Sequence, residues 1–486
     1  MNDLQYIESM WTTHKETIAL IKKGDDYRYG INELKDEEMA FDLYNKANWK
    51  LDSFEERCVG ISPYVCIRLG ECYLNGIGTG KDFTEAFYFL LKCKHYLDCL
   101  PRVYTVCKIQ EDPNRERMEA YVQALLSQLN EEFKKIGFVV CLEDNRVIIL
   151  SKFRVPFQIN AEKHPNLVLL KDCIFQVLKF LPKLYRKSVL HARYGTTDTQ
   201  KEFYDLENVL FYNFGFPKEN FQWILSSGMA FSRMTKSEIK KIQKEKHIAE
   251  KFCHCYEYFA DSKPQVSGDR ENLICEWDFQ SFISINSSKG VFDYWKAMKY
   301  CSDKINTYGS IDTNSKKHFS LYLEIEKPKG KKMYVLGSLK PLLDAIVSSM
   351  HGGDFSDQEI LLFSKKLNVP SEWLKNTALN ILGKRKYIQQ YPSRSGLKWN
   401  PADDLCDKVS VSIFEGNDWR IKGRVYEITP YCPNCGKSKI AKIIYGMPAY
   451  TKELQKDIDE GRVVLAGCMI ENDTPSYFCR WCKTKF

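Results

Sequence analysis

Four cysteines near the C-terminus have the spacing of a metal site. Cys432 and Cys435 are separated by two residues, and so are Cys479 and Cys482. A two-residue gap lets both sulfur atoms of a tight turn face one ion, and two such turns supply the four thiolates that structural zinc prefers. The sequence therefore predicts one Zn²⁺ at these four residues. Cys468, in an apolar segment between the pairs, is not expected to be a ligand.

The segment 431–486 resembles a zinc ribbon, and the resemblance is confined to this segment. Gly436 directly follows the first cysteine pair, where the chain often needs a positive φ. The resemblance implies a zinc ion that serves folding and recognition, because a closed set of four ligands leaves no position for a substrate. In the alternative interpretation, the four cysteines are buried free thiols.

Two central segments contain residues that could bind a divalent metal and act on a phosphate. One contains Asp205 and Glu207, and the other contains Lys340 and Asp344. Carboxylates that converge from separate elements bind Mg²⁺, and a nearby lysine can stabilise a phosphate. The alternative is structural: Asp205 and Glu207 begin a helix, where acids suit the dipole, and Lys340 and Asp344 form an i,i+4 ion pair.

The second of these segments resembles a helix of Holliday-junction resolvases of the RusA type, in which a lysine precedes an aspartate by four residues. Lys340 and Asp344 have this spacing. The resemblance implies metal-dependent cleavage of nucleic acid. The family also carries a cluster of aspartates just upstream, whereas this chain has Gly337 and Ser338 there.

Cys253, His254 and Cys255 form a further group that could bind a metal, with His247 before it and Cys275 after it. A one-residue gap between cysteines suits a metal-binding turn poorly, so half-buried thiols are the favoured interpretation. The chain has no phosphate-binding Gly-x-x-x-x-Gly-Lys-Ser/Thr motif and no Gly-x-Ser-x-Gly nucleophile motif. These absences disfavour a P-loop ATPase and give no sign of a serine hydrolase.

Basic and aromatic residues alternate in the stretch before the cysteine pairs. Cations there could contact phosphates and a tryptophan ring could stack on a base, so the stretch is a candidate nucleic-acid surface. A surface loop that packs its tryptophan on the ribbon is an equally good interpretation. The candidate residues are Lys384, Arg385, Lys386, Arg394, Lys398 and Trp399.

The composition is that of a globular protein with several domains. The chain has 486 residues, of which 44% are hydrophobic and 28% are charged, and a net charge of +8. No apolar run is long enough to span a membrane, and the first residues do not resemble a signal peptide. Eighteen cysteines in such a chain are expected to be reduced thiols, which predicts a cytoplasmic location.

The N-terminal region has the pattern of paired helices. The segment 69–92 resembles a Sel1-like repeat, a relative of the tetratricopeptide hairpin: Gly76 and Gly78 follow one helical stretch, and Asp82 can cap the next. Gly70 and Ala86 are expected to face each other across the hairpin. Weaker copies lie at 35–47 and 115–121. Stacked helical repeats usually bind protein, although a plain helical bundle is the alternative.

The region after the repeats mixes strands and helices. Residues 138–142 and 146–150 are expected to form a hairpin, 167–181 and 235–251 to form helices, and 319–325 and 332–336 to form strands. The predicted fold class is an α+β multidomain protein. Its expected domains are a helical repeat region at 1–130, a mixed α/β region at 136–400 and a small zinc ribbon domain at 401–486.

These observations favour recognition over catalysis, although they leave open whether the chain is an enzyme. We expect a bacterial interaction protein that binds a protein partner through the repeats and DNA or RNA through its C-terminal half. Such a combination suits a nucleic-acid-directed or antiviral defence complex, an expectation that rests on analogy. The alternative is a Mg²⁺-dependent nuclease that uses Asp205, Glu207 and Asp344.

Overall fold

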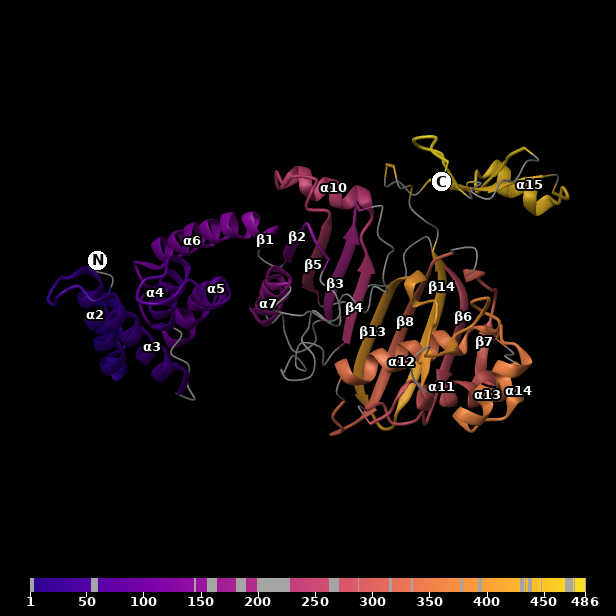
Figure 1. Ribbon diagram of the computed structural model, residues 1–486, viewed down its shortest axis with the longest axis horizontal. Coiled ribbons are helices and arrows are strands. Elements are labelled where there is room, and N and C mark those ends of the chain that lie inside the picture. Colours follow the sequence, from indigo (N-terminus) through magenta and orange to yellow (C-terminus); the bar gives the residue numbers. More distant parts are fainter. Residues whose placement is uncertain are drawn as a thin grey trace. The chain divides into compact units, whose positions relative to one another are not determined.

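The computed structural model describes residues 4–485 except 54–59, 144–145, 155–163, 181–188, 199–227, 262–270, 287, 314–316, 334, 376–378, 392–395, 429–431, 433, 436–438, 447, 468–474 and 476. Asp205, Glu207, Arg394, Gly436 and Cys468 therefore lie outside the described residues. The chain forms two compact units, Met1–Pro182 and Lys183–Phe486 (Figure 1). No helix in the described part of the chain is long and apolar enough to cross a membrane.

The first unit is built from helices that pack as consecutive hairpins, with α2 against α3 and α4 against α5. Most of these helices bury one apolar side. In chain order they are α1 (Leu4–Met10), the short 3₁₀ helix η1 (Thr12–His14), α2 (Lys15–Tyr29), α3 (Glu37–Ser53), α4 (Ser62–Asn75), α5 (Phe83–Cys107) and α6 (Arg115–Ile136).

The turn between α4 and α5 forms as the sequence predicts. Asp82 is the N-cap of α5, and its carboxylate accepts hydrogen bonds from the backbone N–H groups of Thr84 and Glu85 at 2.9 and 3.0 Å. Gly78 has a φ of +65°, and a Cβ atom there would lie 1.9 Å from the carbonyl oxygen of Glu37. Glycine is therefore required where this turn meets the start of α3.

The prediction that Gly70 faces Ala86 is wrong, because Gly70 faces a different residue of α5. The hairpin exists and Ala86 is fully buried, but the atoms nearest to a Cβ on Gly70 belong to Leu90, with its Cδ2 at 2.8 Å. Leu90 lies one helical turn beyond Ala86 on the same face of α5, so the two helices meet four residues further along. The small residue in α4 accommodates a leucine rather than an alanine.

A buried ion pair connects the two helical hairpins. Arg68 of α4 donates two hydrogen bonds to the carboxylate of Asp25 on α2, at 2.7 and 2.6 Å. Tyr44 of α3 donates a third hydrogen bond to the same carboxylate at 2.7 Å. All three residues are buried. Removing either charge would leave the other uncompensated in the core, so this contact fixes how the hairpins stack.

The end of the first unit confirms the predicted hairpin. Strands β1 (Phe138–Glu143) and β2 (Arg146–Ser151) pair in antiparallel register, with Glu143 opposite Arg146. Helix α7 (Pro165–Phe180) follows and packs against α5.

The second unit is organised by a mixed sheet whose strand order is β5-β3-β4-β13-β8-β14-β6-β7. Strand β13 is parallel to β8 and antiparallel to β4, and its central residues Val409, Ser410 and Val411 are all buried. The strands are β3 (Val189–Thr196), β4 (Gly228–Arg233), β5 (His254–Asp261), β6 (Glu271–Phe279), β7 (Ile305–Thr307), β8 (Phe319–Pro328), β13 (Cys406–Gly416) and β14 (Arg420–Ile428).

Helices and short strands complete this unit, and in Figure 1 α11 and α12 lie over one side of the sheet. The expected strand at 332–336 is wrong, because helix α12 begins at Val335 and buries Leu339, Leu342 and Leu343. The elements are α10 (Lys236–Glu245), α11 (Val291–Tyr300), η3 (Ser302–Lys304), α12 (Val335–Ser349), β9 (Gly352–Gly353), α13 (Asp357–Leu367), α14 (Ser371–Lys375), β10 (Lys384–Arg385), β11 (Ile388–Gln390), β12 (Leu397–Trp399) and η5 (Asp403–Leu405).

The last part of the chain forms a separate three-stranded sheet. Strand β15 (Ile440–Ile444) lies between β16 (Val463–Leu465), with which it is parallel, and β17 (Tyr477–Cys479), with which it is antiparallel. Helix α15 (Lys452–Asp459) connects β15 to β16. Residues 406–428, which the sequence analysis assigned to the ribbon domain, instead form β13 and β14 of the large sheet, because their side chains complete its core.

We predict that Gly78→Ala destabilises the first unit by about 1–3 kcal/mol, because the new methyl group would collide with the backbone of Glu37 at a positive φ. Amide hydrogen exchange should quicken in α3, α4 and α5. Gly80→Ala is the matched control, since no atom lies within 4 Å of a Cβ at that position. Equal exchange rates in the two variants would contradict the tight contact.

A second prediction concerns His351, which is buried after α12. Its Nε2 accepts a hydrogen bond from the N–H of Ala402 at 3.2 Å, and its Nδ1 lies 3.3 Å from the carbonyl oxygen of Gly383. Burial lowers the pKa of His351 to about 4. As the pH falls, the unfolded chain therefore takes up a proton at this residue before the folded chain does. The contribution of neutral His351 to the free energy of unfolding is complete above the unfolded pKa and is lost as the pH falls towards 4.

The loss should reach about 3 kcal/mol between pH 6.5 and pH 4. Urea unfolding followed by tryptophan fluorescence would measure it. His351→Gln, which retains a donor and an acceptor, should remove this part of the pH dependence, and an unchanged pH profile in that variant would contradict the assignment.

Candidate functional site

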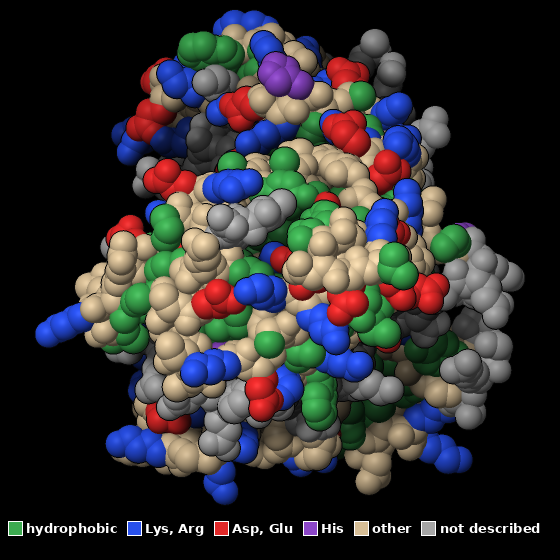
Figure 2. Space-filling model, turned by 90° about the vertical axis from the view of Figure 1, so that its left-hand side faces the viewer, with side chains coloured by type: hydrophobic (Ala, Val, Ile, Leu, Met, Phe, Trp, Pro, Cys, Tyr) green, Lys and Arg blue, Asp and Glu red, His purple; other side chains and the backbone are tan. Residues whose placement is uncertain are grey.

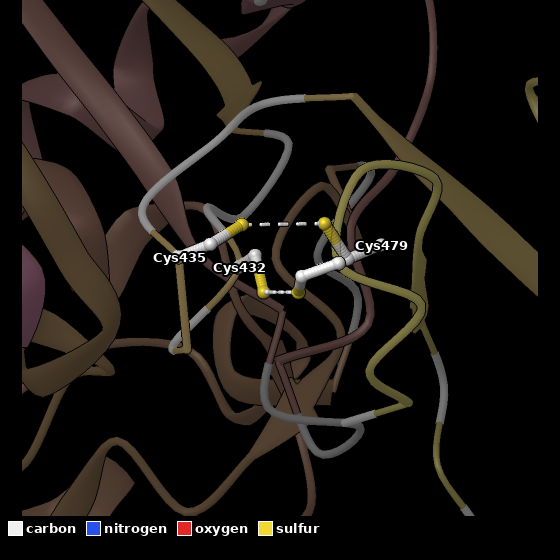
Figure 3. A group of neighbouring side chains, drawn as sticks. Cys432, Cys435 and Cys479 are labelled. Carbon is white, nitrogen blue, oxygen red and sulfur yellow. Dashed lines mark hydrogen bonds between the residues drawn. The ribbon is translucent and has the colours of Figure 1, made fainter.

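The four predicted cysteines converge at one point. Cys432 and Cys435 lie in the segment after β14. Cys479 is the last residue of β17, and Cys482 lies in the turn that follows this strand. The Sγ atoms of Cys432 and Cys482 are 3.4 Å apart, and those of Cys435 and Cys479 are 3.5 Å apart (Figure 3). All four sulfur atoms lie within 4.8 Å of one another. Each sulfur of one pair therefore faces a sulfur of the other.

This arrangement is consistent with a structural zinc site. Four sulfurs at about 2.3 Å from a zinc ion form a tetrahedron with edges of about 3.8 Å, close to the separations found here. We refer to these residues as the cysteine cluster. The cluster offers four protein ligands, so a tetrahedral ion bound there has no open position for chemistry on a substrate.

The small sheet positions the second cysteine pair. Cys479 is paired with Ile440 of β15, and its backbone N–H donates to the carbonyl oxygen of Thr484 at 2.8 Å. Lys483 N–H returns a hydrogen bond to the carbonyl oxygen of Cys479 at 2.8 Å, with a φ of +62° at Lys483. These bonds close a tight turn around Cys482. The sulfurs of this pair are thus fixed by backbone geometry.

The pKa values of two thiols in the cluster are shifted in opposite directions. Burial raises the pKa of the Cys432 thiol. The Thr484 hydroxyl, 3.2 Å from the Sγ of Cys482, lowers the pKa of Cys482 to about 5. A lowered pKa favours the thiolate of Cys482, the form in which cysteine binds a metal, and a cation would favour deprotonation of its neighbours.

The structure places Lys340 and Asp344 in an ion pair on one turn of α12. The Lys340 Nζ lies 2.7 Å from Asp344 and 3.3 Å from Asp403, a residue that the sequence analysis did not propose as a partner. The lysine is thus held between two carboxylates. Asp344 belongs to no group of three candidate metal ligands among the described residues. This contact supports the structural interpretation of the pair; the proposed partners Asp205 and Glu207 are outside the described residues.

The basic stretch is held by protein contacts at several of its candidate residues. Lys386 pairs with Glu359 at 2.9 Å. Arg385 donates to the carbonyl oxygen of Asn400 at 3.1 Å and lies 3.7 Å from Asp404. Backbone pairing of Lys384 and Arg385 with β9 fixes this segment further. The guanidinium and ammonium groups therefore already have acidic or carbonyl partners within the protein, while Lys398 is exposed.

Trp399 is part of an aromatic cluster. Its ring centre lies 5.7 Å from that of Trp295 and 6.5 Å from that of Tyr387. Trp373 also packs against Trp295, at 6.4 Å. Trp399 thus contributes to the packing of α11 against the β11–β12 hairpin, a role that differs from the solvent-facing platform expected for base stacking.

Helices α2, α4 and α6 carry a surface with half-exposed aromatic residues. Arg28 on α2 pairs with Glu71 on α4 at 2.9 Å, and its guanidinium lies 5.1 Å from the ring centre of Tyr29. Burial raises the pKa of Tyr121 on α6 to about 12, and the neighbouring carboxylate of Glu71 adds to the increase. Tyr29 is 49% exposed and Tyr121 is 40% exposed. We call Arg28, Tyr29, Glu71 and Tyr121 the tyrosine strip.

The loop after Tyr29 extends this surface. It exposes Ile31 and Leu34, the latter to 90%. The same loop and the α4–α5 turn line a hollow of about 800 Å³, formed by Lys35, Asp36, Glu37, Glu38, Gly76, Gly78, Thr79 and Gly80. Three carboxylates and one ammonium group line the hollow, so it is acidic. Figure 2 shows basic, acidic and hydrophobic side chains interspersed over the face in view.

We predict that Cys479→Ser releases the zinc ion and loosens residues 440–485 while the large sheet remains folded, because the metal stabilises only the elements that it connects. Elemental analysis should show a loss of one zinc ion per chain, and limited proteolysis should cut within 440–485. Cys107→Ser, an exposed thiol in the first unit, is the control. Retention of the zinc ion by the Cys479 variant would rule out the site.

Comparison with known families identifies the N-terminal helices. The Sel1 repeat family matches residues 24–48 and 63–92. The first match spans the end of α2 and most of α3, and the second spans α4 and the first part of α5. The two clearer sequence copies are thus confirmed, whereas the copy at 115–121 is not part of the match. No curated protein and no solved structure matches the chain. The chain therefore contains Sel1 repeats, which imply protein–protein interaction.

Proposed function

We propose that this protein is an interaction module that binds a partner protein through the tyrosine strip and the adjoining loop 30–36. Its basis is that two half-exposed tyrosines, Tyr29 on α2 within the first matched repeat and Tyr121 on α6 after the second, lie near Glu71 of α4. Tyrosine contributes more binding energy at interfaces than most residues, because it offers a large contact area with few rotatable bonds.

The ion pair between Arg28 and Glu71 prepares the strip for binding. It holds the guanidinium against Tyr29 and places a carboxylate beside Tyr121, so neither ring has to be ordered when the partner arrives. The hollow next to the strip has an excess of carboxylates. These features favour a partner segment that combines an apolar anchor with basic residues.

The cysteine cluster has a supporting role in this proposal. Its zinc ion would maintain the small C-terminal sheet, which buries few side chains of its own and needs an additional constraint. We also propose an intracellular, reducing location, since the described cysteines are free thiols and the cluster needs reduced sulfur. The proposal includes neither a nuclease activity nor a role in antiviral defence, because no observation on the described residues favours them.

Nucleic-acid binding by the basic stretch is not part of the proposal either. Arg385 and Lys386 have partners within the protein, and Trp399 packs against Trp295. Salt-dependent binding of DNA or RNA that is lost in a Lys384→Ala/Lys398→Ala variant would reopen this possibility.

We predict that a Tyr29→Ala/Tyr121→Ala variant loses its partner while it remains folded. Each truncation at such a position typically costs about 1–3 kcal/mol, so the affinity should fall at least about tenfold. Proteins retained by the full-length chain from an extract of its source cells would be quantified by mass spectrometry. The affinity of the purified partner would then be measured for each variant.

Trp49→Ala is the matched control, because Trp49 is an aromatic residue on α3 that is 74% exposed and lies outside the strip. A partner retained equally by all three proteins would place the interface elsewhere. A variant that loses the partner and also unfolds earlier than the control would count as a stability effect and not as support.

A further inference from the structure

A second group of metal-binding side chains lies where β3 ends and β5 begins. The two strands are antiparallel, with Thr196 opposite His254. Asp198 follows the end of β3 by two residues, and Cys253 directly precedes β5. Strand pairing therefore brings together residues that are far apart in the sequence.

The donor atoms of these three residues converge. One carboxylate oxygen of Asp198, the Sγ of Cys253 and one ring nitrogen of His254 all lie within 4.8 Å of one another. His254 is 1% exposed, whereas Asp198 and Cys253 are half-buried. The histidine donor is thus fixed in the core, and the carboxylate and thiol donors are partly accessible to solvent.

The backbone around the group is fixed by hydrogen bonds. The N–H of Thr197 donates to the carbonyl oxygen of Cys253 at 2.9 Å, which continues the strand pairing beyond the last ladder residues. The N–H of Asp198 donates to the hydroxyl of Thr196 at 3.0 Å. These contacts set the positions of Asp198 and Cys253 relative to each other.

Tyr194 holds the imidazole of His254. Its hydroxyl lies 2.9 Å from Nδ1, and the two rings are nearly parallel, at an interplanar angle of 4°. Both residues are buried. A metal-bound histidine usually has its other ring nitrogen fixed by a hydrogen bond of this kind, because the bond orients the ring. With Nδ1 engaged by Tyr194, the nitrogen assigned to the metal is Nε2.

We propose that Asp198, Cys253 and His254 bind a second zinc ion, separate from the ion of the cysteine cluster. Sulfur, nitrogen and oxygen donors in one set suit Zn²⁺ better than Mg²⁺ or Ca²⁺, which prefer oxygen alone. Binding converts the Cys253 thiol to a thiolate and releases its proton to solvent. The described residues supply three ligands of mixed type to this site.

This site differs in kind from the cysteine cluster. Four thiolates close the coordination sphere there, whereas the described residues supply one sulfur, one nitrogen and one oxygen donor here. The first zinc ion is expected to stabilise the small C-terminal sheet, and the second to hold the end of β3 against the start of β5.

Elemental analysis of the purified full-length protein tests the proposal. The wild type should contain about two zinc ions per chain, and Asp198→Asn, Cys253→Ser and Cys479→Ser should each contain about one, since each removes a ligand from one site. Asp198→Asn combined with Cys479→Ser should contain none. Cys301→Ser, a half-buried thiol at the end of α11, is the control and should retain both ions.

Cobalt titration of the Cys479→Ser variant isolates the second site. Co²⁺ bound there should give one weak thiolate-to-metal charge-transfer band, and adding Tyr194→Phe should lower the affinity for Co²⁺ by about 10- to 100-fold. Both Asp198→Asn and Tyr194→Phe preserve the shape of their side chains, so circular dichroism should be unchanged. A wild type with one zinc ion, or a second ion unaffected by Asp198→Asn and Cys253→Ser, would overturn the proposal.

Discussion

The second unit depends on the insertion of β13 between β4 and β8. This strand forms hydrogen bonds to both neighbours, and its central residues are buried on both faces of the sheet. Because Cys406–Gly416 comes late in the chain, the pairs formed earlier remain incomplete until this segment arrives. Helices α11 and α12, the aromatic cluster and the ion pair of Lys340 all precede β13, and the first cysteine pair of the cluster follows β14. The large sheet therefore determines where the other features of this unit can lie.

The first unit follows a different physical logic, since its contacts connect helices that are close in sequence. Each hairpin packs locally, and the Arg68–Asp25 ion pair fixes one hairpin against the next. The same stacking places Arg28 beside Glu71 and presents Tyr29 and Tyr121 at the surface. The buried contacts that stabilise the repeats thus also arrange the surface that we propose for binding.

Ion pairs within the fold occupy several of the cations that give the chain its positive net charge. A chain with a charge of +8 can attract nucleic acid, but several cations that looked available in the sequence are neutralised by carboxylates in the folded protein. Lys340 lies between Asp344 and Asp403, and Lys386 is paired with Glu359. Two of the features that suggested chemistry on phosphates thus serve as contacts between α12, α13 and the segments near residue 400.

The sequence alone determined the features whose cause is local. Two-residue cysteine spacing, the glycines after α4 and the Asp82 cap act within a few residues, so the cysteine cluster and the Sel1 hairpins were predictable. Tertiary structure alone decided the contacts between distant segments: the partner of Gly70, the helix at 335–349, the place of 406–428 in the large sheet and the meeting of Asp198 with Cys253 and His254. Strand pairing sets the last two and helix packing sets the partner of Gly70, and neither a strand nor a helix carries a local signal that specifies its neighbour.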